Sequence, residues 1–165
     1  MNVDEFANLL KQFAERPIPS VIGRHVYVWR KTADALSTRV PRKVLATLDL
    51  NDLCRTLERT PSTDDAARAM LTEAITARLQ QEFPRDERQR VLIVSGCGLL
   101  MRYRVSLGPF MQLASENRLI VFVAPVDDSS YQPGQPLPGY IYLRPDATLS
   151  FFKNSLPGEE AFIGD

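Results

Sequence analysis

Val91-Leu92-Ile93-Val94-Ser95-Gly96-Cys97-Gly98 gives the clearest indication of the fold class. Its first four residues are apolar without alternation, as in a strand covered on both faces of a sheet, and its two glycines predict a tight turn. A second run of this kind, Leu119–Ala124, ends at Pro125. The residues between the runs predict a helical crossover that is interrupted near Gly108-Pro109. Two buried strands joined in this way predict a mostly parallel α/β sheet with a right-handed connection.

Helices and strands also alternate upstream of this block. Asp49 or Asn51 is suited to cap a helix, and the longest helix follows an N-cap at Ser62 or Thr63. The hydrophobic spacing predicts a helix at residues 3–15 with a linker up to residue 20, a strand at 25–30, a short helix or irregular turn at about 32–38, and a strand at 44–48.

The end of the chain has a different character, because six of the 12 prolines fall between Pro125 and Pro157. Residues 126–139 predict a proline-rich loop. Residues 140–143 and 149–152 then predict a closing C-terminal hairpin. We find no internal repeat and no linker between domains, and we therefore expect residues 1–165 to form a single α/β domain with helices on the sheet.

The composition of the 165 residues narrows the class of protein. Hydrophobic residues make up 44% and charged residues 24%, which is typical of a globular domain. The 20 basic and 20 acidic residues balance, which argues against a histone-like nucleic-acid binder. No apolar run approaches the length of a membrane span, and the acidic start MNVDEFANLL does not resemble a signal peptide. Cys54 and Cys97 lack metal-type spacing, which fits the cytoplasm.

Motifs for catalysis or for a cofactor are weak. Residues 24–95 contain no glycine, so Lys31-Thr32 follows the first expected strand without the Walker loop that wraps phosphates. Gly96-Cys97-Gly98 lacks the third glycine of a dinucleotide fingerprint, since position 101 is Met. His25 is the single histidine, which leaves no metal pair. We therefore predict no catalytic residue, no cofactor and no metal, although Cys97 beside a helix N-terminus could have a lowered pKa.

The strongest remaining signal is the placement of charge. Residues 16–43 hold seven basic residues against Asp34 alone, and residues 105–165 carry three basic and seven acidic residues. Arginine suits bidentate contacts with carboxylates or phosphates. One interpretation is a solvated face with ion-pair duties, and the other is a contact surface, for a protein rather than nucleic acid because the net charge is zero. The residues predicted for that surface are Trp29, Arg30, Arg39, Arg42, Arg102, Tyr103 and Arg104.

From about residue 44 onward the layout resembles a known family. VLATLDLNDLCRTLER, the long helix to QQEF, and VLIVSGCGLL followed by RLIVFVAP resemble the small BrxB-type component of BREX phage-exclusion systems. The resemblance implies an accessory component of a bacterial antiviral complex, with a P-loop-NTPase-like sheet but no nucleotide chemistry. It also implies a PglZ-type alkaline-phosphatase-like protein as partner, and assembly rather than catalysis as the function.

Two other classes stay open at this point. A nucleic-acid-binding accessory protein would use the basic residues 16–43 and would bind with a steep dependence on salt. A small enzyme would use Cys97 or paired carboxylates such as Asp49 and Asp52.

Overall fold

The computed structural model describes residues 1–15, 25–57, 61–83, 90–114, 118–125, 130–131, 141–142, 147–156 and 158–164. In chain order its elements are α1 (Val3–Glu15), β1 (Val26–Trp29), α3 (Ala33–Ser37), η1 (Arg42–Val44), β2 (Leu45–Asp49), α4 (Leu50–Arg55), α5 (Asp64–Glu82), β3 (Val91–Ser95), α6 (Gly98–Arg102), α7 (Gly108–Leu113), β4 (Leu119–Val123), β5 (Ser130–Tyr131), β6 (Ile141–Tyr142), α8 (Ala147–Ser155), η2 (Glu159–Ala161) and β7 (Phe162–Ile163).

The main sheet has five strands in the order β2-β3-β4-β1-β7, and every pair in it is parallel. The two apolar runs of the sequence lie at its centre as β3 and β4, with Val91 opposite Leu119 and Val94 opposite Phe122. All five residues of β4 are buried. The prediction of a mostly parallel α/β sheet flanked by helices is therefore confirmed.

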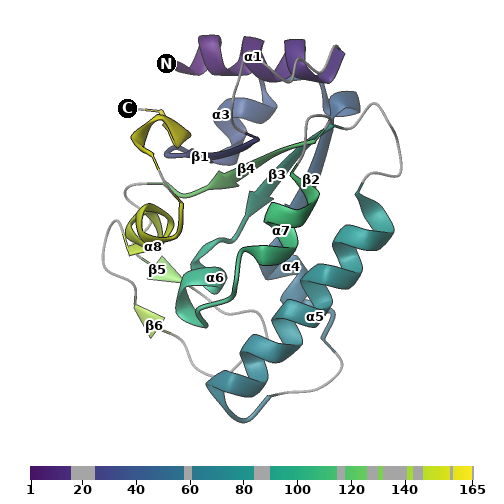
Figure 1. Cartoon of the computed structure of the whole chain (residues 1–165), viewed down its shortest axis with the longest axis vertical. Helices are drawn as coiled ribbons and strands as arrows, with labels where there is room; N and C mark the ends of the chain where they lie inside the picture. The colour runs from purple at the N-terminus through teal and green to yellow at the C-terminus, as the bar shows by residue number, and fades with distance from the viewer. Residues whose placement is uncertain are drawn as a thin grey trace.

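Helices cover both faces of this sheet (Figure 1). On one face α1 and α3 pack on the strands, and the Phe6 ring stacks on Trp29 with the ring centroids 5.6 Å apart. On the other face lie α4, α5, α6, α7 and α8. There Phe122 of β4 contacts Phe110 of α7 and Phe152 of α8, at centroid distances of 5.1 and 4.8 Å. Burial on both faces explains why the central strands are apolar without alternation.

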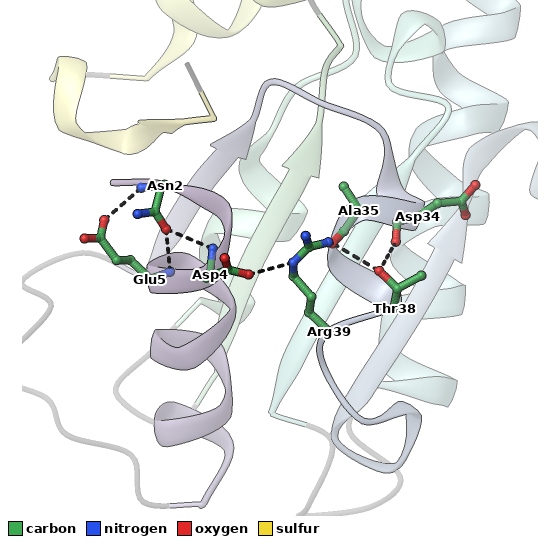
Figure 2. Close-up of polar contacts among 7 residues, drawn as sticks. All are labelled: Asn2, Asp4, Glu5, Asp34, Ala35, Thr38 and Arg39. Atoms are coloured by element: carbon green, nitrogen blue, oxygen red, sulfur yellow. Dashed lines mark hydrogen bonds and ion pairs between the residues drawn. The ribbon is translucent and has the colours of Figure 1, made fainter.

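Side-chain caps fix where several helices begin. The Asp49 carboxylate accepts from the Asn51 backbone N–H at 2.9 Å, and Thr63 Oγ1 accepts from the Ala66 N–H at 3.1 Å. Asn2 Oδ1 accepts from the backbone N–H of Glu5, whose carboxylate accepts in return from the Asn2 N–H (Figure 2). This reciprocal arrangement is a capping box, which satisfies donors that the first helical turn would otherwise leave unpaired.

The prediction of the C-terminal hairpin is wrong in its second strand. Residues 149–152 lie in α8, where Leu149, Phe152 and Leu156 are buried and Lys153 is exposed. That spacing of three and four residues is helical, and a window of four residues is too short to reveal it. Residues 141–142 do form a strand, β6, but it pairs antiparallel with β5 at residues 130–131.

Other differences from the sequence-based expectations are smaller. The crossover between β3 and β4 is interrupted at residues 103–107, and Gly108-Pro109 begin α7 rather than break a helix. The strand β7 at residues 162–163 was not predicted, and it extends the sheet beyond β1. The predicted linker at 16–20 lies outside the described residues. So does the predicted loop at 126–139, apart from residues 130–131.

Candidate functional site

The seven residues predicted for one contact surface lie at opposite ends of the sheet. Arg42 begins η1, which leads directly into the amino end of β2. Arg30 follows the last residue of β1. Arg102 ends α6, which begins beside the carboxyl end of β3, and Tyr103 and Arg104 follow that helix. Because all five strands run in the same direction, residues that precede a strand lie at one end of the sheet and residues that follow a strand lie at the other. The structure therefore does not bring these residues together.

Trp29 belongs to the core, which corrects the prediction that it contacts a partner. Its side chain is fully buried, and its indole Nε1 donates to the Thr32 carbonyl oxygen at 2.8 Å. Phe6 covers one side of the ring, and a Cβ placed on Gly164 would lie only 3.0 Å from Trp29 Cζ3. A satisfied indole N–H and close packing are what a buried tryptophan requires.

Arg102 and Tyr103 also serve the fold. The Arg102 guanidinium makes a bidentate ion pair with Asp64 at the start of α5, with Nη1–Oδ2 and Nη2–Oδ1 distances of 3.0 and 3.2 Å. It lies 4.7 Å from the centroid of the Tyr103 ring, which is buried. The side chain of Arg102 is only 17% exposed. Arg102 thus connects α6 to α5. Tyr103 was predicted to lie on a contact surface, and its burial corrects that prediction.

The ion pair and the burial shift two pKa values. The hydrogen bond from Arg102 lowers the pKa of Asp64 below its ordinary value, since the guanidinium favours the ionised carboxylate. Burial raises the pKa of the Tyr103 hydroxyl, since the interior disfavours its charged form. Both groups therefore keep their usual charges at neutral pH.

Arg104 is exposed and has an unusual backbone conformation. Its φ is 52°, the only positive value outside glycine among the described residues. The Val105 N–H donates to the Leu100 carbonyl oxygen at 2.9 Å, and the Arg104 N–H donates to that of Met101 at 3.3 Å. This is the hydrogen-bond pattern of a Schellman motif, in which glycine usually occupies the position of Arg104.

Arg39 pairs with the first turn of the chain. Its Nε donates to Asp4 Oδ1 of α1 at 2.8 Å, and its Nη1 donates to the Ala35 carbonyl oxygen at 2.9 Å (Figure 2). The arginine side chain is 40% exposed and the aspartate 75%, so water screens the pair. Arg39 connects the end of α3 to α1, and its charge is partly compensated within the molecule.

Arg42, like Arg104, is exposed, and it lies on the short helix η1 next to a second exposed cation, Lys43. We call these two side chains the η1 patch. The strand that follows, β2, is an edge of the main sheet and pairs only with β3 among the described strands. The η1 patch is thus a local basic feature at the amino end of an edge strand.

The glycine turn and the cysteines have structural roles. Gly96 has a φ of +71°, and a Cβ there would lie 3.0 Å from the Asn51 backbone nitrogen and 3.2 Å from Asp49 Oδ1. The structure thus confirms the tight turn that the sequence predicts. The turn lies close to Asp49 and Asn51 because β2 and β3 end side by side. Burial, reinforced by Asp49 and opposed by Arg55, raises the pKa of Cys54 to about 12. Cys97 is buried as well, and its Sγ donates to the Val94 carbonyl oxygen at 3.3 Å.

The described residues contain no group of three or more His, Cys, Asp or Glu side chains arranged to hold a metal ion. None of the described helices combines the length and apolar character needed to cross a bilayer. Comparison of the chain with protein-family models, with curated proteins and with solved structures finds no match.

Proposed function

We propose that this protein is a non-catalytic accessory component of a bacterial anti-phage defence complex, and that it acts by protein–protein assembly in the cytoplasm. The resemblance to the BrxB-type family suggests this class, with a PglZ-type alkaline-phosphatase-like protein as the partner. The observation that carries the proposal is the η1 patch, where two neighbouring cations are exposed beside an edge strand. Exposed cations at the rim of an interface favour an acidic partner surface and set the rate of association.

The arrangement around β1 supports a P-loop-NTPase-like ancestry for the sheet. β1 lies inside a parallel sheet, and Lys31-Thr32 follow it directly and lead into α3. A Walker loop places several glycines between the strand and this Lys-Thr pair, whereas only Arg30 lies between Trp29 and Lys31 here. The proposal of a sheet that lost its phosphate loop, and with it nucleotide hydrolysis, rests on this shortened connection.

The test is co-purification with a PglZ-type protein. We expect the double variant Arg42→Glu/Lys43→Glu to lose most of the captured partner, because it replaces two attractive charges by two repulsive ones. Arg104→Glu is the matched control, since Arg104 is also exposed but lies at the other end of the sheet. Equal retention of the partner by both variants contradicts the proposal.

The alternative function is binding of nucleic acid through the same cations. The exposed η1 patch and the ion-paired but still accessible Arg39 are the observations that favour it. Phosphate contacts release counterions, so an affinity that falls steeply between about 50 and 200 mM salt is its signature. Duplex DNA binding with that salt dependence, weakened in Arg42→Glu/Lys43→Glu and without any captured protein, favours the alternative.

A further inference from the structure

A cavity of about 510 Å³ lies at the opposite end of the sheet from the η1 patch, between β1, α8 and the segment that leads into β7. Its described lining combines two cations, one carboxylate and apolar surface. The lining residues are Arg30, Lys153, Leu156, Gly158, Glu159 and Phe162. Of these, only Arg30 was among the residues predicted for a contact surface, because the other five lie within residues 153–162 and carry no motif.

The strand β1 brings Arg30 to this cavity. The Arg30 backbone N–H donates to the Ile163 carbonyl oxygen of β7 at 2.8 Å, which fixes the residue directly after the strand. Side chains alternate along a strand. Val28 packs on the α8 face and Trp29 on the α1 face, so Arg30 lies on the α8 face. Its half-buried side chain therefore reaches the cavity from the carboxyl end of β1.

The helix α8 supplies the second cation. Lys153 and Leu156 are three residues apart, so they share one side of the helix. Lys153 is exposed, whereas Leu156 is buried, which puts the ammonium group at the mouth and the leucine at the wall. Beyond the helix, Gly158 has a φ of +89° and turns the chain into η2, where exposed Glu159 faces the same cavity.

Phe162 forms the apolar side of the cavity. It is opposite Val28 in the parallel register of β7 and β1, which places it on the same face of the sheet as Arg30. Phe162 is half-buried, so part of its ring contacts the core and part is accessible. The cavity, which is open to solvent on one side, thus combines charged side chains with an apolar surface.

We propose that this cavity binds a small phosphate monoester whose carbon skeleton carries hydroxyl groups, such as a sugar phosphate or a nucleoside monophosphate. A guanidinium fork and an ammonium point charge together match the oxygens of a phosphate dianion. The Glu159 carboxylate accepts hydrogen bonds from hydroxyl groups, and Phe162 and Leu156 contact the carbon skeleton. The volume falls within the roughly 300–1,000 Å³ of small-molecule sites, and ligands of parallel α/β sheets bind outside the carboxyl ends of the strands.

The experiment titrates the ¹⁵N-labelled full chain with ribose 5-phosphate, adenosine 5′-monophosphate and inorganic phosphate, with adenosine as the phosphate-free probe. We expect the phosphate monoesters to shift the amide signals of Lys153, Gly158 and Phe162, and adenosine to leave them in place. If adenosine 5′-monophosphate binds more tightly than ribose 5-phosphate, the cavity also recognises the base. If the two affinities are equal, the cavity recognises the sugar phosphate alone. Absence of shifts at these amides with both monoesters overturns the proposal.

Two exposed lysines give a matched pair of variants. Lys153→Gln removes the cation at the cavity, and we expect it to weaken binding of the monoesters about tenfold, as expected for loss of a hydrogen bond to a charged group. Lys43→Gln removes a cation from the η1 patch and leaves the affinity unchanged. Glu159→Ala removes the acceptor for the hydroxyl groups and reduces the preference for ribose 5-phosphate over inorganic phosphate, while Phe162 and Leu156 still contact the carbon skeleton. Equal affinities in Lys153→Gln and Lys43→Gln overturn the proposal, whatever the outcome of the partner experiment with the η1 patch.

Discussion

The arginines at the two ends of the sheet differ in what surrounds them. Arg102, after β3, has a bidentate contact with Asp64 and lies over the Tyr103 ring, so that only 17% of its side chain is exposed. Arg42, before β2, is exposed beside Lys43. The first arginine connects two helices and the second presents its charge to solvent. An excess of positive charge in a sequence therefore divides into cations that stabilise the fold and cations that are accessible to a partner.

The aromatic residues next to these arginines extend the comparison. Trp29 and Tyr103 lie beside basic residues in the sequence, and both are almost completely buried. Aromatic residues and arginine are enriched at interfaces, yet here the backbone turns each ring toward the core, while Arg104 after Tyr103 is exposed and Arg30 after Trp29 is half-buried. Adjacency in sequence therefore does not bring an aromatic ring to the surface together with its cationic neighbour.

The largest expected effect is that of Trp29→Ala. We expect it to lower the free energy of unfolding by about 3–5 kcal/mol, because it leaves a large cavity under Phe6 and removes the bond to the Thr32 carbonyl oxygen. Urea unfolding followed by circular dichroism measures this, and Trp29→Phe, which retains most of the packing, should lose less. If the Trp29→Ala protein has normal stability but fails to bind a partner, Trp29 belongs to a contact surface and not to the core.

Arg102→Ala should have the next largest effect. The variant loses the ion pair with Asp64 and the contact with the Tyr103 ring, and we expect a loss of about 1–2 kcal/mol in the free energy of unfolding. Arg102→Lys keeps the charge but not the bidentate geometry, so its free energy of unfolding should lie between those of wild type and Arg102→Ala. If Arg102→Ala unfolds at the same urea concentration as wild type, Arg102 does not stabilise the fold and is a surface cation like Arg42.

Arg104→Gly should stabilise the protein. A left-handed conformation costs a residue with a Cβ about 1–2 kcal/mol, and the greater freedom of glycine in the unfolded chain offsets part of this. We expect a net gain of about 0.5–1 kcal/mol in the same urea experiment. Arg104→Ala retains the strained backbone and serves as the control, and a destabilised Arg104→Gly protein would mean that the arginine side chain itself stabilises the fold.

The pH dependence of stability should report on the pair of Arg102 and Asp64. Because the pKa of Asp64 is lower in the folded protein than its ordinary 3.8, its stabilising contribution is complete above that value and is lost as the pH falls through the folded pKa. We expect the urea midpoints of wild type and Asp64→Asn to differ at pH 6 and to converge near pH 2. A constant difference over this range would exclude the pair as the cause.

Much of the fold could be predicted from the sequence, and the reasons are local. The runs at residues 91–94 and 119–124 are buried on both faces, and the caps Asp49 and Thr63 act through nearby backbone N–H groups. By contrast, the four residues 149–152 are too short a window for hydrophobic spacing to distinguish a helix from a strand, and β7 has only two residues.

The candidate site could be predicted only in part. The sequence indicates that arginines gather in residues 16–43, but Arg39 meets Asp4 across 35 positions and Arg102 meets Asp64 across 38. Such pairs form when the chain folds, and no local pattern announces them. The cavity lined by Arg30 and Lys153 is likewise assembled from segments that are more than a hundred residues apart.

The most direct test of the division between the two ends is the free energy of unfolding of Arg42→Ala measured beside that of Arg102→Ala. Exposed substitutions away from fixed contacts usually change stability by less than about 0.5 kcal/mol. We expect Arg42→Ala to stay within that range of wild type and Arg102→Ala to fall at least about 1 kcal/mol below it. Equal losses in the two variants, or a larger loss in Arg42→Ala, would contradict the assignment of Arg102 to the fold and of Arg42 to the surface.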